Sequence, residues 1–273
     1  MCRENVKTAK TDTALPRLQE QREFLCRLTP ERALETIDEA AAFLSERGLL
    51  TRGPDSSLPS LFGACHEEPY APGKRGFGQW PRTKWGWSFA LLRRPGVYGP
   101  KIHHRRKTLY VTEDTAQILD PICRAELERL RSSDADWAML LDHLADAGPS
   151  TSDDLKTELS LKPPQLKKIL YPLELCGAIV GRALAPEDDG RLEGFEYLRW
   201  DQLFPEPAGG DPVGALDDLI VAAVRAAVVA PEREVVRWFP WRRRLDAGSI
   251  DRLVTAGRLQ RPEPGWVAAA ASA

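Results

Sequence analysis

Residues 135–148 of the chain read ADWAMLLDHLADAG, and residues 163–177 read PPQLKKILYPLELCG. In both stretches the apolar residues recur every three or four positions, as on the buried face of a helix, and a glycine ends the pattern. Between them, Ser150 or Ser152 can cap a shorter helix that contains Leu155 and Leu159. The sequence therefore predicts three consecutive helices in the middle of the chain.

Two strands are expected to follow these helices. Residues 178–183 and 196–200 have the composition of paired strands, and the acidic segment Glu187-Asp188-Asp189 lies between them. Three helices followed by a two-stranded wing form the winged-helix arrangement. We therefore predict a winged helix in this part of the chain.

The outer thirds of the chain repeat this plan. After a linker at residues 207–210, the pattern predicts helices at 213–229, 231–239 and 249–256, the last capped by Ser249, and strands at 258–261 and 266–269. Earlier in the chain, it predicts a helix that Thr29 caps and Gly48 ends, a short helix at 58–62, a Trp-rich segment, and a hairpin with arms 101–104 and 108–112. Because the strands come in hairpin pairs and not singly between helices, we predict an α+β, mainly α fold of three tandem winged-helix subdomains.

The predicted organisation has four parts: an N-terminal tail or helix at 1–28, and winged-helix subdomains at 29–130, 131–206 and 211–273. The 273 residues are 42% hydrophobic and 29% charged, which is ordinary for a globular protein. No apolar run reaches the roughly 20 residues of a membrane span, and the N-terminus does not resemble a secretory signal. The five cysteines form no Cys-x-x-Cys pair, which disfavours a disulfide framework and a zinc ribbon. We expect a cytoplasmic protein.

The charge distribution is the most informative feature of the composition. The net charge is only −2, yet residues 69–112 contain no acidic residue at all. Ten basic residues lie in this acid-free interval: Lys74, Arg75, Arg82, Lys84, Arg93, Arg94, Lys101, Arg105, Arg106 and Lys107. A segment of this kind favours a polyanionic partner, and we predict DNA.

The candidate DNA contacts come from two subdomains. In the first they are Lys74, Arg75, Arg82, Lys84, Lys101, His103, His104, Arg105, Arg106 and Lys107, of which Arg105–Lys107 are expected to project from the hairpin turn. In the second they are Lys162, Lys167 and Lys168 on or beside the recognition helix. An exposed polar face is an equally good interpretation of this helix, and the acidic wing tip would repel phosphate.

Aromatic residues accompany these charges. Some of them can stack on an unpaired base or enter a duplex as a wedge, or they can form core: Phe77, Trp80, Trp85, Trp87, Tyr98 and Tyr110. For Trp85 and Trp87 the core is at least as good an interpretation. A second aromatic and basic cluster, residues 238–244, can line the far side of a DNA channel or simply anchor a loop.

Four short motifs in the first subdomain resemble a known family. They are Leu58-Pro59-Ser60-Leu61-Phe62, Trp85-Gly86-Trp87, Tyr98-Gly99-x-Lys101, and Arg106-Lys107-Thr108-Leu109-Tyr110-Val111. With these motifs the chain resembles relatives of the AlkZ/YcaQ family of winged-helix DNA glycosylases. The resemblance implies three winged helices around a DNA-binding channel and, in the true glycosylases, excision of alkylated or crosslinked bases.

The chain departs from that family at the catalytic motif. The family's Gln-aliphatic-Gln or Gln-aliphatic-Asp motif, which positions the hydrolytic water, is absent. Gln19-Glu20-Gln21 has the wrong centre, and Gln117-Ile118-Leu119-Asp120 has one residue too many. DNA binding without ordinary base excision is therefore our first hypothesis. An active glycosylase that uses Glu113 or Asp114 is the second, and a transcriptional regulator or protein-interaction scaffold is the third.

No cofactor or metal is expected. The adjacent His103 and His104 would point to opposite faces of a strand, and Cys65-His66 has no further ligands at a recognised spacing. No long heptad helix favours a dimer, so the expected state is a monomer that binds DNA and no membrane.

Overall fold

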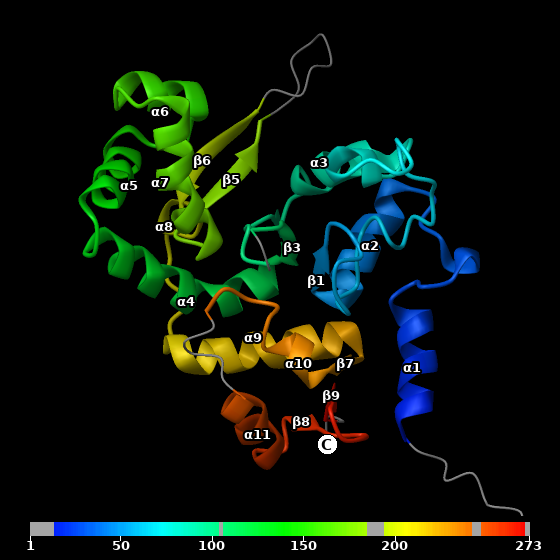
Figure 1. Cartoon of the computed structure of the whole chain (residues 1–273). Helices are drawn as coiled ribbons and strands as arrows, with labels where there is room; N and C mark the ends of the chain where they lie inside the picture. The colour runs from blue at the N-terminus through cyan, green and yellow to red at the C-terminus, as the bar shows by residue number, and fades with distance from the viewer. Residues whose placement is uncertain (1–13, 104–105, 185–193, 242–246, 271–273) are drawn as a thin grey trace, which may run out of the picture.

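The structure is a computed structural model that describes residues 14–103, 106–184, 194–241 and 247–270 (Figure 1). It contains three units with one common order of elements: a helix, a strand, two or three helical segments, and two further strands. The first unit comprises α2 (Ile37–Arg47), β1 (Leu49–Thr51), the 3₁₀ helices η2 (Gly76–Gln79) and η3 (Lys84–Gly86), α3 (Trp87–Leu92), β2 (Val97–Tyr98) and β3 (Leu109–Thr112). The second comprises α5 (Ala135–Ala147), β4 (Ser150–Thr151), α6 (Ser152–Glu158), α7 (Pro163–Leu175), β5 (Ile179–Ala183) and β6 (Phe195–Arg199). The third comprises α9 (Pro212–Ala227), β7 (Val229–Pro231), α10 (Glu232–Val235), α11 (Ala247–Thr255), β8 (Leu259–Gln260) and β9 (Trp266–Ala269).

Each unit closes its own small antiparallel sheet. The strand orders are β1-β3-β2, β4-β6-β5 and β7-β9-β8, so in every unit the last strand lies in the middle. The first strand of each unit, which follows its first helix, thereby pairs with the last strand of the two-stranded wing. This arrangement confirms the predicted fold of three winged helices.

One long helix connects the first unit to the second and packs on the third. α4 (Glu113–Arg131) begins directly after β3, where the Thr112 hydroxyl caps it by accepting a hydrogen bond from the Thr115 amide. It packs along α9, and their apolar faces contribute to one core cluster that the first and third units share. Figure 1 shows the first and second units on one side of this helix pair and α11 on the other. The outlying α1 (Ala14–Leu25) packs against β7 of the third unit.

Some predicted elements were wrong. The helix predicted from Thr29 is a single 3₁₀ turn, η1 (Pro30–Arg32), and α2 starts later because the Thr36 hydroxyl accepts a hydrogen bond from the Glu39 amide. Residues 58–62 are not a helix. Their backbone pairs with Thr51, whose amide donates to Pro59 and whose carbonyl accepts from Leu61.

The predicted hairpin has a different first arm. β3 pairs with β2 and not with residues 101–103, although the His103 and Lys107 backbones do bond to each other. In the third unit α10 is much shorter than the predicted 231–239. α11 begins before Ser249, which is a buried residue inside the helix and not its cap. Outside the described residues lie His104, Arg105, the acidic segment 187–189 and residues 242–244 of the aromatic and basic cluster.

Candidate nucleic-acid interface

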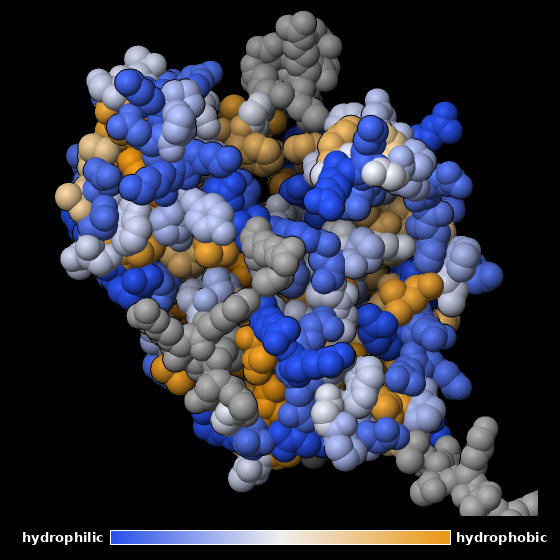
Figure 2. Space-filling model, viewed as in Figure 1, coloured by the Kyte–Doolittle hydropathy of each residue, from blue (hydrophilic) through white to orange (hydrophobic). Residues whose placement is uncertain are grey.

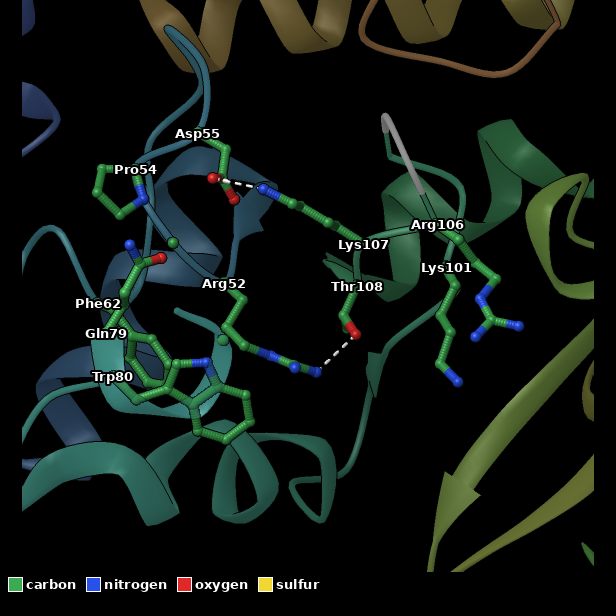
Figure 3. A pocket seen from close by; sticks show the side chains of 12 residues that line it. Arg52, Pro54, Asp55, Phe62, Gln79, Trp80, Lys101, Arg106, Lys107 and Thr108 are labelled. Carbon is green, nitrogen blue, oxygen red and sulfur yellow. Dashed lines mark hydrogen bonds and ion pairs between the residues drawn. The ribbon is translucent and has the colours of Figure 1, made fainter. Parts of the chain in front are cut away.

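A pocket of about 300 Å³ opens on the first unit, beside the second (Figure 3). Three segments and the ring of Phe62 line it: residues 52–55 after β1, residues 76–80 in and after η2, and residues 101 and 106–108 before β3. Its walls carry aromatic, basic and amide side chains together. This volume is near the lower limit of about 300 Å³ that is usual for ligand sites.

Arg52 is the central charged group of this pocket. Its guanidinium lies 4.8 Å from the centroid of the Trp80 ring, and its Nη2 donates to the Thr108 hydroxyl at 2.7 Å. Its Nε donates to the Tyr110 hydroxyl at 3.3 Å. Among the described residues Arg52 has no carboxylate in ion-pair contact. The pocket therefore holds a fixed, stacked and uncompensated positive charge, which suits an anionic ligand.

Asp55 and Lys107 join the two walls. Figure 3 shows their ion pair across the pocket, together with the bond between Arg52 and Thr108. The two side chains are 40% and 39% exposed, so this pair contributes little to stability and can exchange for a ligand. Asp55 is the carboxylate that lines this pocket.

Behind the turn of residues 101–108, a buried carboxylate from the second unit holds two further cations. Glu174 of α7 is 3% exposed and pairs with both Lys101 and Arg106, the latter at 2.9 Å. The Arg106 guanidinium also lies 4.9 Å from the centroid of the Tyr171 ring. Figure 3 shows the Lys101 and Arg106 side chains extending away from Arg52. These contacts attach the pocket wall to the recognition helix of the second unit.

The same helix presents an exposed basic face. Lys167 and Lys168 precede Tyr171 by four and three residues, so all three lie on one side of α7. All three are exposed, as is Lys162 at the helix N-terminus. Because Tyr171 contacts Arg106, this basic face continues from the pocket wall.

The loop that carries Arg52 and Asp55 is anchored from the third unit. Glu234 of α10 accepts hydrogen bonds from the Ser57 amide, from its hydroxyl at 2.6 Å and from the Trp238 indole at 3.0 Å. Burial opposes ionisation of Glu234, but these bonds outweigh it and leave its pKa below the ordinary value of 4.5. Arg22 of α1 donates to the Ser57 carbonyl from the other side.

The acid-free interval is less positive in space than in sequence. Five of its cations pair with carboxylates from other parts of the chain: Lys84 with Glu35, Arg94 with Asp38, Lys101 and Arg106 with Glu174, and Lys107 with Asp55. Arg106 and Lys107 were expected to project from the hairpin turn, but both pair with carboxylates that lie more than 50 residues away in sequence, so the sequence did not reveal these partners. Lys74, Arg75, Arg82 and Arg93 are exposed, with no ion pair among the described residues.

Several candidate residues lie inside the fold. His103 is 1% exposed, and Lys84 is half-buried with its ammonium bonded to the Leu34 carbonyl. Tyr110 is fully buried, and burial raises its pKa. Trp85 and Trp87 are half-buried, with Trp87 against the core of the first unit. Only Trp80 of the six named aromatics lines the pocket.

The two carboxylates considered for catalysis do not line the pocket. Glu113 accepts a hydrogen bond from the Tyr98 hydroxyl, and burial together with this carboxylate raises the pKa of Tyr98 to about 12. Asp114 is exposed in the first turn of α4. The pocket is lined instead by Arg52 and Asp55, which the sequence analysis did not identify as site residues. The signal for them is the polar Arg52-Gly53-Pro54-Asp55 turn after two buried leucines.

Among the described residues, no three His, Cys, Asp or Glu side chains gather as a metal site. None of the helices described is both long enough and apolar enough to span a bilayer.

The comparisons with known proteins support the fold. No protein-family model and no curated protein sequence matches the chain. Among solved structures, the chain is similar to Streptomyces sahachiroi DNA glycosylase AlkZ, with a TM-score of 0.55 and 14% sequence identity. The similarity covers 93% of this chain and 69% of the AlkZ chain. The resemblance inferred from four short motifs is therefore confirmed as a likeness of fold along nearly the whole chain.

Proposed function

We propose that this chain, which shares its fold with AlkZ, binds DNA across the face formed by the pocket and α7. The observation that carries the proposal is the uncompensated Arg52 guanidinium, held over the Trp80 ring in a pocket open to solvent. An aromatic ring beside a fixed guanidinium suits a base together with its phosphate. The fold of a protein named as a DNA glycosylase adds to this argument.

The proposed phosphate contacts are the exposed cations around the pocket. They are Lys74, Arg75 and Arg82 of the first unit and Lys162, Lys167 and Lys168 of the second. Lys101, Arg106 and Lys107 border the same surface, but their ion pairs must loosen before they reach a phosphate. Figure 2 shows hydrophilic side chains on both sides of the hollow between the first and second units. Three winged helices in one chain supply a long contact face, so we propose that a monomer binds.

The test is binding to intact, mismatched and abasic duplexes across a salt series. If six cations contact phosphates, the slope of log K against log salt is about −5, because each contact contributes about −0.9. Binding whose affinity does not change with salt, or no binding at 20–50 mM salt, would contradict the proposal.

A second candidate function is hydrolysis of an N-glycosidic bond, and the position of Asp55 favours it. A carboxylate in a cationic pocket can stabilise the developing sugar cation and orient a water. The Asp55–Lys107 pair places such a group beside Arg52 and Trp80 without the family's glutamine motif.

The test is incubation with alkylated duplexes followed by alkali, which cleaves abasic sites. If the candidate is correct, wild-type protein yields strand breaks, and Asp55→Asn abolishes them without loss of DNA binding. Breaks that persist in Asp55→Asn but vanish in Glu113→Gln would return catalysis to Glu113.

A further inference from the structure

A loop beside the pocket carries exposed aromatic rings that the pocket does not use. Residues 68–82 run out and back as two paired arms: the Tyr70 amide donates to Trp80, Ala71 to Gly78, and Arg82 to Glu68. At the tip, Gly73 and Gly76 have φ values of +79° and +66°, which favour glycine. A Cβ on Gly78 would lie 2.6 Å from Lys74 Cβ, so the arms meet closely. We call this segment the aromatic loop.

Two rings of the aromatic loop face solvent. Tyr70 is 54% exposed and Phe77 is 44% exposed, and their centroids lie 5.1 Å apart. Large apolar side chains exposed side by side mark a contact surface more often than isolated ones do.

These rings are fixed in position by the core behind them. The ring centroid of Phe77 lies 4.9 Å from that of Trp80 and 5.6 Å from that of Trp85. The centroid of Trp80 lies 5.4 Å from that of the buried Phe62. A ladder of rings therefore runs from the core to solvent. Because the exposed rings are already ordered, a partner that stacks on them loses little side-chain entropy to the contact.

The charge around the rings selects the partner. Lys74, Arg75 and Arg82 are exposed on the same loop. The loop has no acid beyond Glu68 at its base. Apolar rings flanked by cations are the chemistry of a nucleic-acid wedge, which places the ring against bases and the cation against phosphates.

The loop also fixes where such a wedge would act. Its inner residues Gly76, Gln79 and Trp80 line the pocket, whereas Tyr70 and Phe77 do not. A nucleotide at the pocket thus has the two exposed rings as neighbours along the strand.

We propose that Tyr70 and Phe77 stack on the base exposed beside an unpaired or missing partner, so that the protein prefers such duplexes to intact ones. This inference rests on the proposed DNA binding. Stacking contributes about 1–3 kcal/mol per base, which corresponds to a preference of about 5-fold to 150-fold.

The experiment measures fluorescence anisotropy with an intact duplex and with one abasic duplex of the same length. We expect Phe77→Ala and Tyr70→Ala each to lower affinity for the abasic duplex about tenfold and to change affinity for the intact duplex less than twofold. Phe77→Trp keeps a stacking ring and retains the preference. Met139→Ala, at a 36% exposed position on α5, is the matched control and changes neither affinity. Thermal unfolding of each variant shows whether it is still folded. If Phe77→Ala is unfolded, the affinities of Tyr70→Ala for the two duplexes decide the test.

A second readout places the ring at the base. With 2-aminopurine opposite the abasic site, wild-type protein is expected to quench the fluorescence by stacking, and Phe77→Ala is not. Equal losses on both duplexes, or none on either, overturn the stacking role.

The outcomes separate this inference from the proposed function. If wild-type protein binds neither duplex, DNA binding itself fails. If it binds both equally, only the stacking role fails. If sedimentation shows a dimer that Phe77→Ala dissociates while DNA affinity is unchanged, the rings serve a second copy of the chain instead.

Discussion

At the scale of single residues, the contacts of Arg52 explain why its replacement by lysine is not conservative. The planar guanidinium stacks on Trp80 and donates to Thr108 and Tyr110 at the same time, and an ammonium cannot do both.

We expect Arg52→Ala to lower affinity for DNA about tenfold, near the lower end of the roughly 1.5–3 kcal/mol that a hydrogen bond to a charged group contributes. Arg52→Lys recovers only part of this loss, because it keeps the charge without the stacking geometry. The measurement is anisotropy at fixed salt, with Arg233→Ala on the third unit as a control of equal charge. Full recovery by lysine would show that Arg52 acts by charge alone.

Asp120 ends the Gln117–Asp120 stretch that was compared with the family's catalytic motif, and in the structure it has a structural role. Asp120 is 2% exposed and accepts hydrogen bonds from the Trp200 indole at 2.8 Å, from Arg124 at 2.8 Å and from the Ala208 amide at 2.9 Å. It joins α4 to α8 (Trp200–Leu203) and to the linker before α9. Its carboxylate is therefore a fixed part of the core.

We expect Asp120→Ala to lower the free energy of unfolding by about 3–5 kcal/mol, because a buried indole and a guanidinium lose their partner. Asp120→Asn keeps some of the bonds and is expected to cost less. Urea denaturation measures both. Glu128→Ala, at an exposed position of the same helix, is the control and changes stability by at most about 0.5 kcal/mol.

At the scale of elements, α7 is the recognition helix of the second unit and also the support of the pocket wall. The buried carboxylate of Glu174 holds Lys101 and Arg106, while Lys167 and Lys168 face solvent. Lys167 and Lys168 lie in the first half of the helix and Glu174 lies near its C-terminal end, so the two roles can be separated by mutation.

We expect the double variant Lys167→Ala/Lys168→Ala to reduce the salt slope of DNA binding by about two, since each phosphate contact contributes about one. The fold should stay intact because both side chains are exposed. The matched control is Lys156→Ala on α6, where the lysine pairs with Asp153. An unchanged slope would place α7 outside the DNA interface.

Elements with local signals were predictable and those made by distant pairing were not. The helices α5 and α7 and the strands β5 and β6 follow from the spacing of nearby apolar residues. β1, β4 and β7 have two or three residues each and exist only because a strand later in the chain pairs with them. α4 was missed because Thr112, its cap, was taken as the end of a strand.

In the candidate site too, the local features were predictable from the sequence and the distant partners were not. The basic, Trp-rich character of the first unit was visible in sequence, and Trp80 does line the pocket. The partners were not visible: Glu174 is 68 residues from Arg106, and Ser57 is 177 residues from Glu234. Local sequence therefore showed how many cations there are but not which of them are already neutralised.

At the scale of the whole molecule, the third unit supports the pocket without lining it. Glu234 holds the loop of Arg52 and Asp55 through Ser57, and its hydrogen bonds need the ionised carboxylate. A group whose pKa is lower in the folded state stabilises the fold above its unfolded value and loses that effect as pH falls.

We expect wild-type protein to exceed Glu234→Ala in stability by a constant amount from pH 7 to about pH 5. The difference then shrinks as pH falls below the ordinary value of 4.5 towards the lower folded pKa. Urea midpoints of both proteins between pH 7 and pH 3 measure this difference. A difference that is independent of pH would mean that Glu234 acts by packing and not by charge.

The packing of α1 has a consequence for synthesis of the chain. The Cys26 thiol donates to the carbonyl of Ala226, 200 residues later, and Leu15 is buried against Val229 and Ala268. At about 5–20 residues per second, a ribosome needs roughly 10–40 s to make the intervening segment. During that interval the first and second units can close their own sheets, while α1 still lacks its docking surface. The helix α1 is therefore made early but docks late, and its apolar side stays accessible to chaperones until the third unit has been made.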